Sequence, residues 1–222
     1  MTRPFGLKLG HLPSLFPLPM LLDLEDSLLL LLDYQTRMLP ALHEGAAALG
    51  NALRLARMAQ LLHVPLWATE HCPQQLGPTL PELLASLQPT QILAKTQFSA
   101  CAQGLVALLR PPQRAPSPAG NARSLPKHLQ KPLAPVQRNT VLIAGCEVHV
   151  CVLQTALDLL EEEFDVWVVT DACASRTERN RDAAFDRLAG AGVELVTTEM
   201  VAFEWLRDAR HPAFKAVLEM IR

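Results

Sequence analysis

Short apolar runs alternate with longer amphipathic segments along most of this chain, and this alternation restricts its fold more than any other feature. Apolar runs bounded by polar residues are typical of strands buried on both faces, whereas apolar residues spaced three and four apart are typical of helices that cover a sheet. Strands are predicted over 27–33, 64–70, 91–96, 140–146, 165–171 and 193–199. Helices are predicted over 40–62, 81–87, 150–163, 177–189 and 211–222. The sequence therefore predicts a three-layer α/β protein with a mostly parallel six-stranded sheet and helices on both faces.

The length of 222 residues, half of them apolar, is enough for one sizeable α/β core. We expect a single domain over 20–222, preceded by an extension over 1–19. Residues 110–138 interrupt the alternation with seven prolines, six Lys or Arg and no acidic residue. Such a segment favours a solvated surface insertion, with a docking or lid role as the alternative.

The net charge and the cysteines indicate what kind of partner this protein binds and in which cellular compartment it works. The net charge of -2 argues against a general nucleic-acid binder and favours a small-molecule partner. The apolar N-terminal stretch is broken by prolines and by acidic residues, so it fits neither a signal peptide nor a membrane span. The cysteines are odd in number and lie in or beside apolar segments, which favours free thiols in a reducing, cytoplasmic compartment. They are Cys72, Cys101, Cys146, Cys151 and Cys173.

Reactive side chains follow three of the predicted strands. Asp33 and Lys95 end two strands, and the turn after a third leads to Cys151 at the start of a helix. Ligands bind beyond the carboxyl ends of parallel strands, so we expect the three groups to meet at one edge. A lysine and a helix start favour a thiolate at Cys151, and Asp33 can take and return a proton. Taken singly, an Asp at a strand end is more often a turn residue than a catalytic one, and a Lys is more often simply solvated. The other cysteine of this segment, Cys146, ends an apolar strand and is expected to be a structural thiol.

Cofactor motifs are absent from the sequence. The cysteines form no C-x-x-C pair, and only His149 stands nearby as another ligand type, so a zinc site is not expected. No G-x-G-x-x-G follows the first strand, so a dinucleotide is not expected either. The sequence therefore predicts no cofactor.

Three ordered motifs, "LLLLLDYQTRMLPAL", "LAKTQFSA" and "GCEVHVCVLQTALDLL" with its continuation, resemble the isochorismatase-like cysteine hydrolases, which include nicotinamidases and related amidases. The segment "TEHCPQQLGPTLPEL" is similar in particular to the isochorismatase-domain hydrolases of that family. The resemblance runs from about Met20 to the C-terminus without the proline-rich insertion. It implies the Rossmann-like fold of the isochorismatase-like hydrolases.

The resemblance also implies roles for individual residues. Asp33 would be the general base, Lys95 would orient the thiol and lower its pKa, and Cys151 would be the nucleophile. A cis peptide bond is implied between Cys146 and Glu147, with the backbone N–H groups of Glu147 and Cys151 forming the oxyanion hole. The expected walls of the substrate pocket, besides Glu147, are Tyr34, Glu70, His71 and Phe98.

Two departures from the family pattern limit the function. The Asp-x-His spacing of metal-binding nicotinamidases is not reproduced in "TEHCPQQ", so no metal is expected. Cys151 argues against isochorismate, because true isochorismatases lack that cysteine. We therefore expect a cytoplasmic, homo-oligomeric amidase that cleaves a C–N bond of a small amide through a thioester. The alternatives are a catalytically idle family member that serves as a binding or assembly module, and a vinyl-ether or ester hydrolase on the same scaffold.

Overall fold

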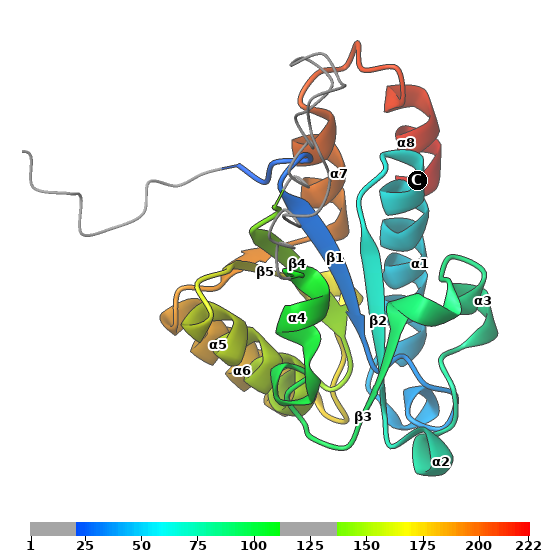
Figure 1. Ribbon diagram of the computed structural model, residues 1–222. Helices are drawn as coiled ribbons and strands as arrows, with labels where there is room; N and C mark the ends of the chain where they lie inside the picture. Colours follow the sequence, from blue (N-terminus) through cyan, green and yellow to red (C-terminus); the bar gives the residue numbers. More distant parts are fainter. Residues whose placement is uncertain (1–20, 112–136) are drawn as a thin grey trace, which may run out of the picture.

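Six parallel strands form the sheet in the computed structural model, which describes residues 21–111 and 137–222 (Figure 1). The strand order is β3-β2-β1-β4-β5-β6. Their bounds are β1 Ser27–Leu32, β2 Leu66–His71, β3 Ile92–Lys95, β4 Thr140–Gly145, β5 Asp165–Val169 and β6 Glu194–Val196. The two central strands, β1 and β4, are buried along their whole length. The chain reverses its direction of winding between them, which is where ligands bind in such sheets.

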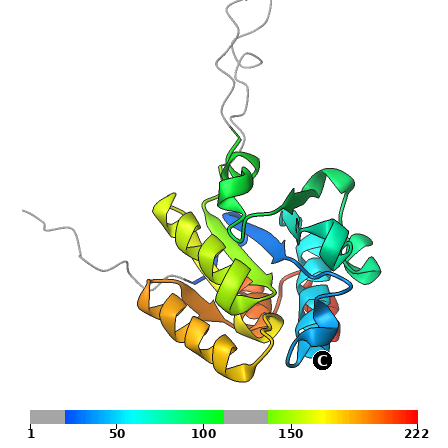
Figure 2. The ribbon, with the colours of Figure 1, turned by 90° about the horizontal axis from the view of Figure 1, so that it is seen from below.

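Helices cover both faces of the sheet (Figures 1 and 2). Alternate leucines of β1 point to opposite faces, so that Leu29 and Leu31 join one apolar core and Leu28, Leu30 and Leu32 join the other. The first core includes side chains of α1 Gly45–Leu61, α7 Thr198–Leu206 and α8 Phe214–Ile221, and the second those of α4 Leu105–Leu109, α5 Leu153–Glu161 and α6 Glu178–Gly190. The predicted three-layer α/β architecture is confirmed.

Several predicted boundaries were wrong. The strand predicted over 193–199 stops at Val196, because the Thr197 side chain accepts a hydrogen bond from the Met200 N–H and caps α7, a helix that the periodicity did not predict. The helix predicted over 40–62 starts only at Gly45, because the segment around Pro40 forms the 3₁₀ turn Leu39–Ala41. The helix predicted over 81–87 shortens to α3 Pro81–Leu84.

Short helical turns connect the strands and the longer helices. The α2 turn is Pro73–Leu76, and 3₁₀ turns lie at Pro89–Gln91, Cys101–Gln103 and Thr170–Ala172. Within the described ranges, no helix combines the length and apolar character needed to cross a membrane. The expected extension over 1–19 and nearly all of the expected insertion over 110–138 lie outside the described residues.

Candidate functional site

The carboxyl ends of the strands bring Asp33, Lys95 and Cys151 together. Asp33 directly follows β1, and Lys95 is the last residue of β3, on the far side of β2. The Lys95 side chain reaches across, and its Nζ lies 2.7 Å from Asp33 Oδ2. Cys151 lies in the π-helical turn Val148–Val152 that follows β4 and continues directly into α5. The expected convergence of a carboxylate, an ammonium and a thiol is therefore present in the structure.

The ion pair between Asp33 and Lys95 is fully buried, with both side chains 0% exposed. Lys95 Nζ also donates to the carbonyl oxygens of Phe98, at 3.1 Å, and Gln97, at 3.4 Å. The second carboxylate oxygen, Asp33 Oδ1, accepts a hydrogen bond of 2.6 Å from Thr69 Oγ1 on β2. Buried charges need partners of this kind, and here each charge has more than one.

Backbone geometry places the Asp33 carboxylate at the end of β1. Asp33 has a φ of 57°, in the left-handed region that aspartate tolerates better than most residues. Nearby, Gly145 ends β4, where an added Cβ would lie 2.5 Å from the Leu32 Cβ and 2.8 Å from the Leu32 carbonyl oxygen. Glycine therefore allows the two central strands to approach closely just below the site.

The turn that carries Cys151 is held by backbone hydrogen bonds. The Cys146–Glu147 peptide bond is cis. The N–H groups of Val150 and Val152 both donate to the Glu147 carbonyl, at 3.1 and 3.3 Å. Among the residues that the structure describes, the N–H of Glu147 itself donates no hydrogen bond, so it is free for a ligand.

Burial shifts the Cys151 thiol away from the acidic behaviour expected from the sequence. Cys151 is only 3% exposed. Burial, followed by the negative charge of Asp33, raises the pKa of Cys151 to about 12, and the positive charge of Lys95 lowers it by a smaller amount. The charges of Asp33 and Lys95 act on the thiol in opposite directions, so both groups lie close enough to Cys151 to influence its proton. The resting site is therefore a neutral thiol beside an ion pair, and Asp33 is placed to receive the thiol proton as the sulfur attacks.

Alkylation with iodoacetamide should modify Cys151 in preference to Cys146. Cys151 lines a cavity, whereas Cys146 is 0% exposed and burial raises its pKa well above the ordinary value. Because the pKa of Cys151 is raised, the thiolate fraction and the labelling rate should climb about tenfold per pH unit from pH 6 to 9 without a plateau. Peptide mass spectrometry at graded pH measures both. Faster labelling of Cys146, or a rate that is already level at neutral pH, would contradict this assignment.

A cavity of about 650 Å³ opens above Cys151. Two of the expected wall residues, His71 and Phe98, line it, with their ring centroids 5.4 Å apart. Glu147 lines it as well. The full lining is Arg37, Met38, Ala41, Leu42, His71, Leu76, Phe98, Glu147, Val150, Cys151 and Arg176.

Tyr34 and Glu70 do not lie in that wall, so the prediction for these two residues was wrong. Tyr34 is buried, and its hydroxyl donates to the Ala172 carbonyl in the core beneath α1. The Glu70 carboxylate accepts hydrogen bonds from the Thr79 N–H and hydroxyl, at 2.7 and 2.9 Å. Both side chains hold loops together instead of facing the cavity.

Arg176 is a wall residue that the sequence did not indicate. Its Nε and Nη2 donate to the two carboxylate oxygens of Glu147, at 2.9 and 2.6 Å, and its backbone N–H adds a third bond of 3.0 Å. These hydrogen bonds lower the pKa of Glu147. The pair fixes the Glu147 side chain next to Cys151 and leaves no net charge there.

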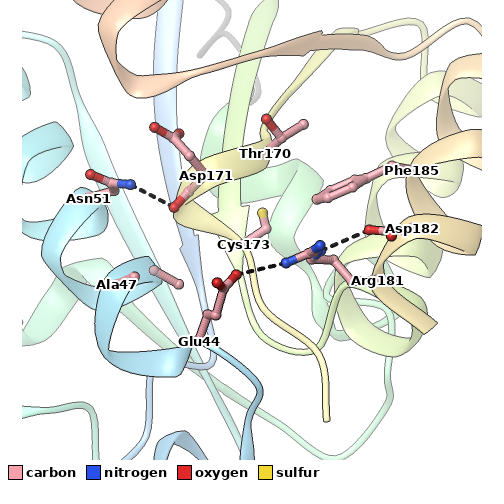
Figure 3. Close-up of a pocket in the computed structure, with 10 residues that line it drawn as sticks. Glu44, Ala47, Asn51, Thr170, Asp171, Cys173, Arg181, Asp182 and Phe185 are labelled. Atoms are coloured by element: carbon pink, nitrogen blue, oxygen red, sulfur yellow. Dashed lines mark hydrogen bonds and ion pairs between the residues drawn. The ribbon is translucent and has the colours of Figure 1, made fainter. Parts of the chain in front are cut away.

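A second cavity, of about 400 Å³, lies between α1, α6 and the turn after β5 (Figure 3). Glu44 and Asp182 point towards Arg181 there, each 2.9 Å from a guanidinium nitrogen, with Cys173 nearby. No residue lines both cavities. Across the described ranges, no group of three or more His, Cys, Asp or Glu side chains is arranged to hold a metal ion.

Comparison with known proteins agrees with this architecture. The isochorismatase domain family matches residues 124–200. Isochorismatase domain-containing protein 2 of Rattus norvegicus is 36% identical over 199 residues, which cover 89% of this chain and 82% of that protein. The solved structure of MAR1 ribonuclease from Caenorhabditis elegans is 30% identical with a TM-score of 0.75, covering 91% of this chain and 92% of its own. The YcaC gene product of Escherichia coli, an octameric hydrolase of unknown specificity, is 29% identical with a TM-score of 0.73, covering 91% of this chain and 89% of its own.

The resemblance read from the three sequence motifs is therefore confirmed. The similarity to the rat protein extends over most of both chains. This chain belongs to the isochorismatase family of hydrolases.

Proposed function

We propose that the protein hydrolyses the C–N bond of a small amide through a thioester on Cys151. One observation carries the proposal: the fully buried ion pair of Asp33 and Lys95 lies against a thiol that lines a cavity. Buried charges gathered with a thiol beside a cavity, at the carboxyl ends of parallel strands, are typical of active sites.

In the first half of the reaction, Cys151 Sγ attacks the amide carbonyl carbon while Asp33 takes the thiol proton. The backbone N–H groups of Glu147 and Cys151 donate to the resulting oxyanion. The tetrahedral intermediate then collapses, the C–N bond breaks, and Asp33 returns its proton to the departing ammonia or amine. This leaves an acyl group bonded to Cys151.

In the second half, water attacks the thioester carbonyl and Asp33 accepts a proton from that water. The C–S bond breaks, the carboxylic acid product leaves, and Cys151 recovers its proton. Lys95 holds the Asp33 carboxylate in place through its 2.7 Å bond in both halves. Thr69 fixes the other carboxylate oxygen, so that Asp33 keeps one orientation in both halves.

A panel of primary amides and matched esters, assayed for ammonia and acid release with and without EDTA, tests this function. Release of ammonia that EDTA leaves unchanged supports an amidase without a metal, because the thiol supplies the nucleophile. Turnover of the esters alone would favour the ester-hydrolase alternative. A panel without any turnover, together with a Cys151 that resists iodoacetamide even at pH 9, would favour the binding-module alternative. The ribonuclease activity in the name of the Caenorhabditis elegans relative is a property of that protein. For the present protein we propose a small-molecule substrate, because the cavity beside Cys151 has a volume of about 650 Å³.

We also propose that the protein works in the cytoplasm, since all five cysteines are free in the structure.

We expect the protein to self-associate in solution. The Escherichia coli YcaC protein is octameric. Two large apolar side chains of α7, Met200 and Phe203, are 44% and 42% exposed and offer a contact surface, whereas Trp205 and Leu206 are buried in the core. Multi-angle light scattering should give a multiple of the chain mass. A monomer mass over the whole working concentration range would refute self-association.

A further inference from the structure

The charges around the Cys151 cavity do not cancel. Glu147 and Arg176 neutralise each other through their paired hydrogen bonds. Burial, followed by the positive charge of Lys95, lowers the pKa of His71, so its imidazole is neutral at neutral pH. Of the charged side chains that line the cavity, this leaves Arg37 as the one without a counter-charge.

Arg37 is held at the cavity by the chain around it. Its N–H donates to the Leu76 carbonyl at 3.0 Å, and its Nη1 donates to the Gln75 carbonyl at 3.0 Å. The neighbouring Thr36 N–H donates to the Pro78 carbonyl at 3.1 Å. These bonds tie the segment after β1 to α2 and place the guanidinium without the help of a ligand.

Most donors of the Arg37 guanidinium remain free. A guanidinium has five N–H donors in a planar fork, and only Nη1 is bonded in the described part of the chain. No carboxylate of that part comes within ion-pair distance of Arg37, unlike Arg138, Arg176, Arg181 and Arg210. A free, oriented fork matches the two oxygens of a carboxylate.

The rest of the wall is apolar. It comprises Met38, Ala41, Leu42, Leu76, Phe98 and Val150. The cavity therefore combines a thiol for the reaction, an apolar wall and one uncompensated positive charge. One positive charge suits a monoanion, and a dianionic phosphate would leave negative charge unmatched.

We propose that the substrate of this protein is an amide that carries a carboxylate, and that Arg37 binds this carboxylate while Cys151 attacks the amide carbon. This inference rests on the proposed amidase function. Arg37 is then the residue that selects the anionic substrate among amides of the same length.

Three pairs of compounds of increasing length test the proposal. Succinamate, glutaramate and adipamate carry a carboxylate at the far end, and butanamide, pentanamide and hexanamide replace that carboxylate with a methyl group. Each compound is tested for ammonia release and, separately, for protection of Cys151 against iodoacetamide, which reports binding without turnover. The proteins compared are the wild type, Arg37→Gln and Arg57→Gln, a control in which an exposed arginine of α1 outside the cavity is replaced.

At least one carboxylate compound should be favoured over its methyl counterpart by about tenfold or more in kcat/KM or in protection, as expected for a hydrogen-bonded charge pair. Arg37→Gln should reduce that ratio to within about threefold of unity, and Arg57→Gln should keep it. Equal results for the two series in the wild type in both readouts, including no turnover and no protection by either, overturn the proposal. So does a preference that persists in Arg37→Gln.

The two readouts separate this inference from the function on which it rests. Selective protection of Cys151 by the carboxylate series without any release of ammonia would support the Arg37 site and contradict the amidase. Release of ammonia from both series at equal kcat/KM would support the amidase and overturn the Arg37 site.

Discussion

Replacing Cys151 with alanine should lower amide hydrolysis by at least about 10³-fold while the fold is kept, because the proposed reaction has no other nucleophile. Cys151 lines a cavity, so removal of the sulfur enlarges an existing cavity and creates no new void in the core. The substitution should therefore lower the unfolding free energy by no more than about 1 kcal/mol. Ammonia release and thermal unfolding, measured on the same preparation, check the two parts.

The matched control is Cys72→Ala, which removes a partly buried thiol outside the Cys151 cavity. This variant should retain hydrolysis close to the wild-type rate. If Cys151→Ala retained the rate of the control, the nucleophile would have been assigned to the wrong residue.

Asp33→Asn should affect both rate and stability. The amide cannot accept the thiol proton, and loss of a general base costs about 10²–10⁴-fold in rate. From the sequence alone, a nearly isosteric amide would be expected to leave the fold intact. The structure changes this expectation, because the variant leaves the fully buried Lys95 ammonium without its counter-charge. Breaking a buried pair on one side typically costs about 3–5 kcal/mol of unfolding free energy.

A double variant separates these two effects. Asp33→Asn combined with Lys95→Met removes both charges, and replacing a whole buried pair by uncharged groups is often neutral for stability. The double variant should therefore recover most of the unfolding free energy lost in Asp33→Asn but none of the activity. Chemical denaturation and the ammonia assay measure the two quantities. Recovery of activity would contradict the role of Asp33 as the general base. A double variant that is less stable than Asp33→Asn would argue against the broken ion pair as the reason for the instability.

The sequence indicated the sheet and the meeting of the reactive groups because both follow from strand periodicity. A buried parallel strand is a short apolar run, and β1 and β4 are such runs. Residues at the carboxyl ends of parallel strands must share one edge of the sheet. The proximity of Asp33 and Lys95 could therefore be predicted before any distance between them was known. Thr69 left a weaker signal, as the first polar residue of its strand, and only the structure gives its register with Leu32.

The pocket wall could not be obtained from the same periodicity. Arg37 and Arg176 lie in loops, whose positions depend on hydrogen bonds between distant segments, such as the one between the Arg37 N–H and the Leu76 carbonyl. Tyr34 follows Asp33 directly, yet it turns into the core. The behaviour of the Cys151 thiol also depends on burial, which raises its pKa to about 12, whereas the helix start alone suggested an acidic thiol.

Mass spectrometry of the acid-quenched enzyme tests the thioester most directly. An amide that releases ammonia is mixed with the enzyme, the reaction is stopped with acid during turnover, and the peptide that contains Cys151 is analysed. We predict an added mass equal to the substrate minus ammonia on Cys151, which hydroxylamine removes and which is missing from Cys151→Ala. An acyl group on another residue, or an enzyme in full turnover whose Cys151 peptide keeps its unmodified mass, would contradict the account.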